Sequence, residues 1–218
     1  MHRLASIAVF VLLAMTPRPG HADSASVIEV GTFSSAPEGA EPPNGWRPLT
    51  FPKIPRHTRY ELIKEGDAAV VRAVSEAAAS GLVHEVRVDL KDYPILQWRW
   101  KVEQVNRKSD VHTKQGDDYA ARIYVTFEYD PDAVSLAGKA KYRLGRLLFG
   151  EIPIAAINYV WENSTPKNTI VPSPYTDFSR MIVIENAGSP AGQWIMEERN
   201  VYEDYKRAFG EEPPPVNG

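Results

Sequence analysis

The chain has 218 residues, 43% of them hydrophobic, with a formal net charge of −3 at pH 7 and no cysteine. Without cysteine, disulfides, thiolate metal sites and a lipid-modified cysteine anchor are all excluded. The slightly acidic balance argues against a nucleic acid partner, because phosphate binding needs a basic surface.

The N-terminus has the features of a secretory signal. Arg3 supplies positive charge, an apolar run extends from Leu4 to Met15, and small residues at Gly20 and Ala22 flank a cleavage site. The apolar run is too short to span a bilayer well. We predict that residues 1–22 are removed after Ala22, which takes away two arginines and changes the net charge from −3 to −5. The alternative is an uncleaved anchor. After cleavage, we expect a periplasmic or secreted protein without a membrane span.

Residues 23–55 are rich in proline, which favours edge strands and turns, with Trp46 as a plug. Beyond them, apolar and polar residues alternate with the period of two that is typical of half-buried strands. The pattern predicts a hairpin of Thr58–Lys64 and Ala68–Val74, and further strands at Val83–Leu90, Leu96–Val102, Tyr119–Phe127, Ile152–Trp161, Met181–Glu185 and Gln193–Arg199.

Two segments break this period. Apolar residues recur at helical spacing over 132–149, before Gly150, and a short helix is predicted over Glu203–Phe209, before Gly210. No internal repeat or interdomain linker is visible, so residues 23–218 are expected to form one domain. The prediction is a mainly β, antiparallel β-sandwich with one inserted helix and a short C-terminal helix.

Tryptophans mark the expected core. Trp98 and Trp100 share one face of a strand whose other face is charged, so burial is favoured over a platform for sugar rings. Tyr159 and Trp161 also share a face, and we expect them in the core. Trp194 follows a segment with glycine and proline, which places it near a rim.

The polar faces of two strands supply the candidate ligand-binding residues Arg99, Lys101, Arg122 and Tyr124, to which we add Trp194. If the two strands are neighbours, their side chains form a cationic patch that could hold an anionic sugar or a carboxylate. The alternative is a solvated outer face whose ion pairs contribute little to stability.

Acidic residues beside these strands have structural explanations. Asp117 and Asp118 point to opposite faces of a strand, so we expect turn chemistry and one ion pair with an arginine, rather than calcium binding or an acid/base pair. Arg199 and Asp204 are expected to form a buried pair that fixes the terminal helix. The scattered histidines lack zinc spacing, and no serine-hydrolase elbow, phosphate-binding loop or dinucleotide fingerprint occurs. No cofactor, metal site or catalytic residue is therefore predicted.

Several segments resemble a bacterial family known as domain of unknown function 3047. The matching pieces are Ala79-Ser80-Gly81-Leu82, Tyr93-Pro94 through Val102, Gly116 through Arg122, Asn158-Tyr159-Val160-Trp161, Arg199-Asn200-Val201, and Asp204-Tyr205 through Pro214. The resemblance implies an exported, galactose-binding-like sandwich of jelly-roll type and no established activity. Members of this family usually continue beyond the Pro-Pro segment into a strand, an Asp/Asn-rich turn and a final strand, so the chain is expected to be truncated at its C-terminus.

We therefore predict a non-catalytic module that binds a carbohydrate or another polar small molecule on one sandwich face. The first alternative is a polysaccharide lyase-like enzyme, in which an arginine neutralises a uronate carboxylate and Tyr124 moves a proton. The second alternative is an envelope protein that binds another protein.

Overall fold

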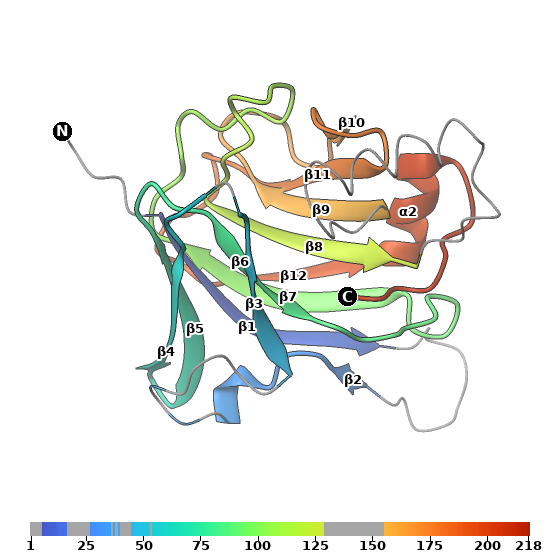
Figure 1. Cartoon of the computed structure of the whole chain (residues 1–218). Helices are drawn as coiled ribbons and strands as arrows, with labels where there is room; N and C mark the ends of the chain where they lie inside the picture. The colour runs from blue at the N-terminus through green and yellow to red at the C-terminus, as the bar shows by residue number, and fades with distance from the viewer. Residues whose placement is uncertain are drawn as a thin grey trace.

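The computed structural model describes residues 6–16, 27–35, 37, 39, 45–52, 54–128 and 155–218, and these ranges are mainly β (Figure 1). The strands are β1 (Ser6–Thr16), β2 (Ile28–Glu29), β3 (Trp46–Thr50), β4 (Arg59–Glu65), β5 (Ala68–Ser75), β6 (Ser80–His84), β7 (Ile95–Val102), β8 (Ala121–Phe127), β9 (Ala155–Trp161), β10 (Ile170–Pro172), β11 (Ser179–Glu185) and β12 (Ile195–Asn200). A 3-10 turn spans Phe33–Ser35, and helix α2 spans Val201–Phe209. The helix predicted over 132–149 lies outside the described residues.

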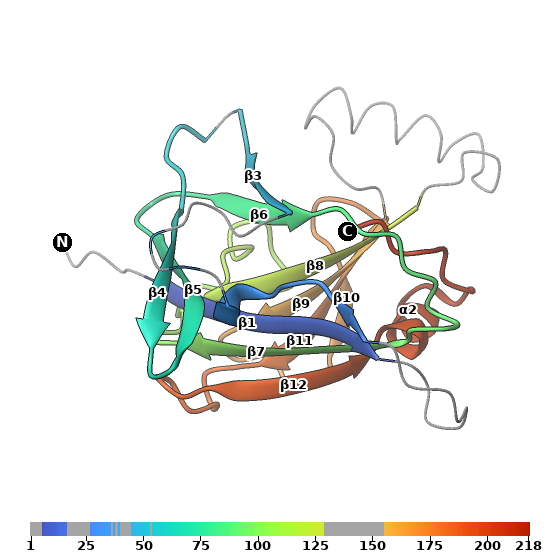
Figure 2. The ribbon, with the colours of Figure 1, turned by 90° about the horizontal axis from the view of Figure 1, so that it is seen from below.

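The strands form a sandwich of two main sheets. The large sheet has the order β12-β7-β1-β5-β4, with β2 paired to β1, and the four-stranded sheet has the order β10-β11-β9-β8. A small third sheet pairs β3 with β6. The pairs are antiparallel except for β9 and β11, which run parallel. The two main sheets face each other, and α2 lies at one end of the sandwich (Figures 1 and 2).

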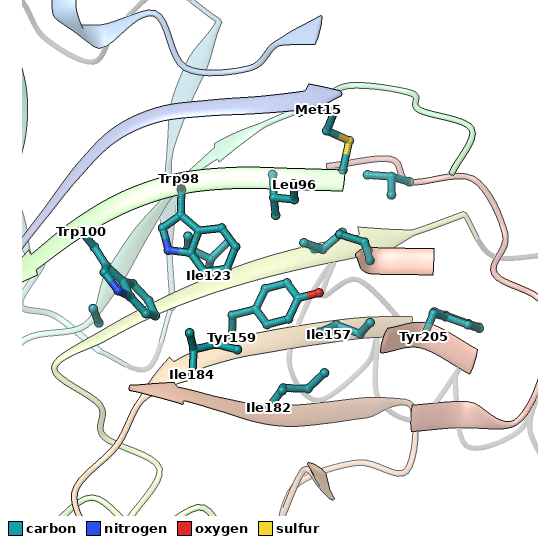
Figure 3. Close-up of a cluster of buried hydrophobic side chains, with 14 of the residues drawn as sticks. Met15, Leu96, Trp98, Trp100, Ile123, Ile157, Tyr159, Ile182, Ile184 and Tyr205 are labelled. Atoms are coloured by element: carbon teal, nitrogen blue, oxygen red, sulfur yellow. The ribbon is translucent and has the colours of Figure 1, made fainter. Parts of the chain in front are cut away.

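The core between the sheets is built from the aromatic residues that alternation predicts. Trp98 and Trp100 of β7 are fully buried, as are Tyr159 and Trp161 of β9. The Trp98 ring stacks on Tyr159 at 5.3 Å between centroids, and Trp100 lies 5.6 Å from Trp161. Figure 3 shows Trp98, Trp100 and Tyr159 in the space between the sheets. The prediction that these four aromatic residues form the core is confirmed.

Three smaller apolar clusters of the described residues lie outside this core, and in one of them Ile63 and Trp194 pack on Val70. Val160, Met181 and Val183 point to the outer side of the four-stranded sheet, where Val111 from the loop before β8 covers them. At the β4–β5 hairpin, Phe33, Leu62 and Val71 pack together, and the half-buried Trp46 packs against them. Trp46 therefore covers a small apolar cluster, which agrees with the covering role predicted for it.

Element boundaries follow local signals. The β4–β5 hairpin forms as predicted, around Gly66 at φ +64. Asn200 caps the start of helix α2, because its side chain accepts from the Glu203 N–H. Gly210 caps its end in the left-handed region at φ +79. The single strand predicted over Val83–Leu90 is wrong in its extent: β6 ends at His84, and beyond it Val88 pairs with Val216 of the C-terminal segment.

The apolar N-terminal segment has a place in this fold. Residues Ser6–Thr16, part of the segment that we predict to be a signal peptide, form β1 in the interior of the large sheet. Met15 is buried in the main core. No helix within the described ranges has the length and apolarity needed to cross a bilayer.

Candidate functional site

The Arg122 cluster consists of Asp117, Tyr119, Arg122 and Tyr124 and lies on the outer face of the four-stranded sheet. Alternation along β8 sends Ile123 into the core and leaves Arg122 and Tyr124 outside. The guanidinium carbon of Arg122 lies 4.5 Å from the centroid of the Tyr119 ring and 5.4 Å from that of Tyr124. One guanidinium nitrogen donates to the Tyr124 hydroxyl, and Nη2 donates to Asp117 Oδ1 at 2.8 Å. Arg122 is thus held in one orientation from several sides.

The electrostatics of this cluster are balanced. Burial lowers the pKa of the Arg122 guanidinium, but the neighbouring Tyr124 and Asp117 more than offset this, so Arg122 stays charged. Burial and then the Asp117 carboxylate raise the pKa of Tyr119, which keeps that phenol neutral. The side chain of Tyr124 is 47% exposed. The cluster therefore presents an exposed phenol beside a cation that one carboxylate neutralises.

A buried amide lies next to Tyr124 on the same sheet face. Asn158 of β9 is directly opposite Tyr124 in the ladder and is almost fully buried. Its Nδ2 donates to Ser179 Oγ at 2.6 Å, whereas its Oδ1 accepts no hydrogen bond among the described residues. Buried polar atoms are normally paired, so the Asn158 Oδ1 atom is exceptional and can still accept a hydrogen bond.

The Trp194 cluster consists of Glu65, Arg99, Lys101 and Trp194 and lies on the outer face of the large sheet. Lys101 Nζ lies 2.6 Å from Glu65 Oε1, and Trp194 Nε1 donates to the same oxygen at 3.1 Å. The hydrogen bond from Lys101 lowers the pKa of Glu65. Both cations also lie close to the indole, with Arg99 at 5.1 Å and Lys101 at 5.4 Å from a ring centroid. These groups largely satisfy one another.

The predicted residues therefore divide into two groups instead of forming one patch. Strand β7 pairs with β12 and β1, whereas β8 pairs with β9 in the other main sheet. The condition for a single patch, that the strands of Arg99 and Arg122 are neighbours, is therefore not met. Alternation along one strand identifies which residues share a face, but it does not say which strands are paired, and this is why the sequence could not separate the two groups.

Two acidic residues that were not predicted as site residues, Glu185 of β11 and Glu197 of β12, lie close together between the two main sheets. Glu197 of β12 accepts a hydrogen bond from Trp100 Nε1 at 3.0 Å. Glu185 of β11 is buried, and Lys167 Nζ lies 2.6 Å from its Oε2. Burial and then the charge of Glu185 raise the pKa of Glu197 to about 7. We call Glu185 and Glu197 the edge carboxyl pair.

The predicted ion pair between Arg199 and Asp204 is present. Arg199 Nη2 donates to Asp204 Oδ1 at 2.6 Å and Nε to Oδ2 at 2.8 Å, in a bidentate arrangement. The hydroxyl of Tyr159 also donates to Asp204 Oδ2, at 2.9 Å. Burial and then the Asp204 charge raise the pKa of Tyr159, so it remains a neutral donor. The pair joins β12, α2 and the aromatic core.

The sequence held partial signals for the residues that were missed. Within Gln193–Arg199, alternation already places Glu197 on the opposite face from Glu198, so an inward carboxylate could have been inferred. The partner of Glu197, which is Glu185, could not have been inferred, because β11 and β12 belong to different sheets. Asn158 likewise lies between buried residues in a predicted strand, but its neighbour Tyr124 is known only from the register.

The acidic residues before β8 have separate roles, as predicted. Asp117 pairs with Arg122, whereas Asp118 accepts from Asn106 Nδ2 at 2.9 Å. Within the part of the chain that the structure describes, no group of three or more histidine, aspartate or glutamate residues could hold a metal ion.

The model of the family described as "Protein of unknown function (DUF3047)" matches residues 44–218, most of the chain. No curated protein and no solved structure gives a significant match.

Proposed function

We propose that this chain, which belongs to the DUF3047 family, is an exported, non-catalytic module that binds a carbohydrate or a similar polar ligand at the Arg122 cluster. The observation that carries the proposal is the exposed ring of Tyr124, held against a guanidinium that is itself fixed by Tyr119 and Asp117. Sites for polar ligands combine an apolar surface with a few well-placed hydrogen-bonding groups, and a rigid site loses less entropy on binding.

The charge of the cluster favours a neutral polar ligand over a polyanion. Asp117 neutralises Arg122 within the cluster, at 2.8 Å. A uronate would therefore have to compete with an ion pair that is already formed. Hydroxyl groups can instead accept from the remaining guanidinium N–H groups and donate to the Tyr124 oxygen. This changes the expectation from an anionic sugar to a neutral one.

The Trp194 cluster is less suited to ligand binding. The indole N–H of Trp194 is taken by Glu65, and the cations near its ring are Lys101, paired with the same carboxylate, and Arg99. A ligand there would have to break contacts within the protein before it could make its own. We therefore assign Arg99, Lys101 and Trp194 a structural role across the large sheet.

Export is part of the proposal. The positively charged start, the short apolar run and the small residues before Ala22 support removal of residues 1–22. A protein without cysteine also needs no disulfide chemistry after export. The module would then act in the periplasm or outside the cell.

The test is a screen of the processed protein, residues 23–218, against neutral and uronate-containing oligosaccharides, followed by titration calorimetry of each hit. We expect Tyr124→Ala and Arg122→Ala to weaken binding by about tenfold or more, which is about 1.4 kcal/mol. Arg99→Ala on the other sheet is the matched control and should leave the affinity unchanged. If a glycan binds equally well to all three variants, the Arg122 cluster is not the site.

A lyase-like enzyme is the second candidate, because Arg122 donates to the Tyr124 oxygen and so fixes the position of a hydroxyl group that could take part in proton transfer. Appearance of unsaturated product from alginate, pectin or hyaluronate, abolished in Tyr124→Phe, would establish it. Binding that survives in Tyr124→Phe without product formation would favour the non-catalytic module.

A further inference from the structure

Strand β1 occupies an interior position in the large sheet. Residues Ser6–Phe10 pair antiparallel with β5, and Ala8–Thr16 pair antiparallel with β7, with an irregularity between Val11 and Ala14. Because β5 and β7 are both antiparallel to β1, they run parallel to each other. The same segment is the apolar part of the signal peptide that we propose to be removed, so the inference below rests on that proposal.

Removal of residues 1–22 leaves a position one strand wide between β5 and β7. Neighbouring strands lie about 4.7–4.9 Å apart, so the two flanking strands would be about 9–10 Å apart. Both would then present unpaired backbone groups at an open edge. We call this position the β1 slot.

Contacts over the outer side of the slot oppose its closure. Trp194, which precedes β12, packs on Val70 of β5, as Ile63 of β4 also does, and the indole N–H of Trp194 donates to Glu65. Glu65 in turn pairs with Lys101 of β7. These contacts join the β4–β5 hairpin to β7 and β12 across the position of β1. Moving β5 by a full strand spacing to meet β7 would disrupt them.

The slot has a core side and an outer side. The strand position of Phe10 is opposite Trp100 and Val71, which are both buried. The adjacent position of Val9 is opposite Lys101 and Arg72, on the outer face. Directly paired residues share a face, so a strand that fills the slot needs an apolar residue at the first position and tolerates a polar one at the second.

We propose that the processed protein takes an extended, mainly apolar segment of a partner protein into the β1 slot, antiparallel to β7, by strand addition. Residues Ser6–Thr16 lie between β5 and β7 and pair with both strands through backbone ladders. The slot can therefore hold a segment of this kind. A second copy of the chain is a poorer donor, because each strand of its described residues already has a place in one of its own sheets.

The experiment uses processed protein purified after secretion and, as the probe, a synthetic peptide of residues 6–16 with lysine tails for solubility. We expect saturable one-to-one binding and slower hydrogen exchange of backbone amides in β5 and β7. A Phe10→Glu peptide should bind about tenfold more weakly or worse, because it places a charge on the core side. The Val9→Glu peptide is the matched control and should bind at least as well as the parent, because its carboxylate lies opposite Lys101 and Arg72.

Several results would overturn the proposal: no peptide binding by a folded processed protein, equal binding of the two glutamate peptides, or a dimer of the processed protein in which β5 and β7 are already protected. If residues 23–218 do not fold alone, refolding is repeated with each peptide. Folding with the parent and Val9→Glu peptides only supports the slot, and any other pattern contradicts it.

Mass spectrometry of the exported protein separates this inference from its premise. An intact N-terminus refutes processing. A processed N-terminus with no peptide binding refutes only the slot. Glycan binding at the Arg122 cluster is measured on the other sheet of any folded form of the protein, processed or intact, and does not depend on peptide binding.

Discussion

Glu197 is the residue whose protonation should most clearly affect stability. Burial and then the charge of the buried Glu185 raise its pKa from 4.5 to about 7, although the hydrogen bond that Trp100 donates to it at 3.0 Å lowers the pKa. A folded state with a raised carboxyl pKa binds the proton more tightly than the unfolded state does. The resulting stabilisation is fully present below pH 4.5 and is lost as the pH rises through 7.

The size of the effect follows from the pKa change. One pKa unit corresponds to about 1.36 kcal/mol, so a rise from 4.5 to about 7 corresponds to at most about 3 kcal/mol of unfolding free energy between low and high pH. Lys167, which pairs with Glu185, and solvent at the strand edge reduce it. We expect Glu197→Gln, which keeps an acceptor for the Trp100 N–H, to raise stability at pH 8 by about 1–3 kcal/mol.

The assay is urea unfolding of wild type and variant at pH values from 4 to 8. The unfolding free energy of the variant minus that of wild type is plotted against pH. Taking the difference removes the contribution of other titrating groups. Glu198→Gln is the matched control, since Glu198 is exposed on the same strand and accepts from Gln97. A difference curve for Glu197→Gln that is flat, or that rises toward low pH, would refute the assignment.

Two further substitutions test the end of the fold. Asp204→Asn leaves the bidentate Arg199 with a buried, uncompensated charge and should cost about 3–5 kcal/mol in urea unfolding, whereas the exposed Glu203→Gln on the same helix should cost little; similar costs for both would contradict the role of the buried pair. Gly210→Ala should lower stability by about 1 kcal/mol, because φ is +79 and no neighbouring atom crowds the added carbon. An unchanged urea midpoint would show that the left-handed cap carries no strain.

Period-two alternation was sufficient for the core but not for the site. It correctly placed Trp98, Trp100 and Tyr159 inside, because each lies on a strand with one polar and one apolar face. It could not show that β7 and β8 lie in different sheets, since pairing depends on contacts between distant segments. The candidate site was therefore predicted residue by residue and not as an arrangement.

The Arg199–Asp204 pair was predictable for a different reason. Its two members are five residues apart, across the boundary between a strand and a helix with clear capping signals. Glu185 and Glu197 come together only because the two sheets stack at one edge, and short-range patterns carry no such information. Local geometry was thus recoverable from the sequence, and the packing of sheet on sheet was not.

The proposed ligand site and the β1 slot lie in opposite sheets, so their occupancies should be nearly independent. Trp98 of β7 stacks on Tyr159 of β9, and this close-packed core separates the slot from the face that bears Tyr124. A rigid core with one arrangement has no second state for either ligand to favour. For any oligosaccharide whose binding depends on Tyr124, we expect saturation with the residue 6–16 peptide to change affinity by less than about twofold, or about 0.4 kcal/mol. A tenfold change in calorimetric affinity, with the reciprocal change in peptide affinity that linkage requires, would show instead that the core has two arrangements and that strand addition selects between them.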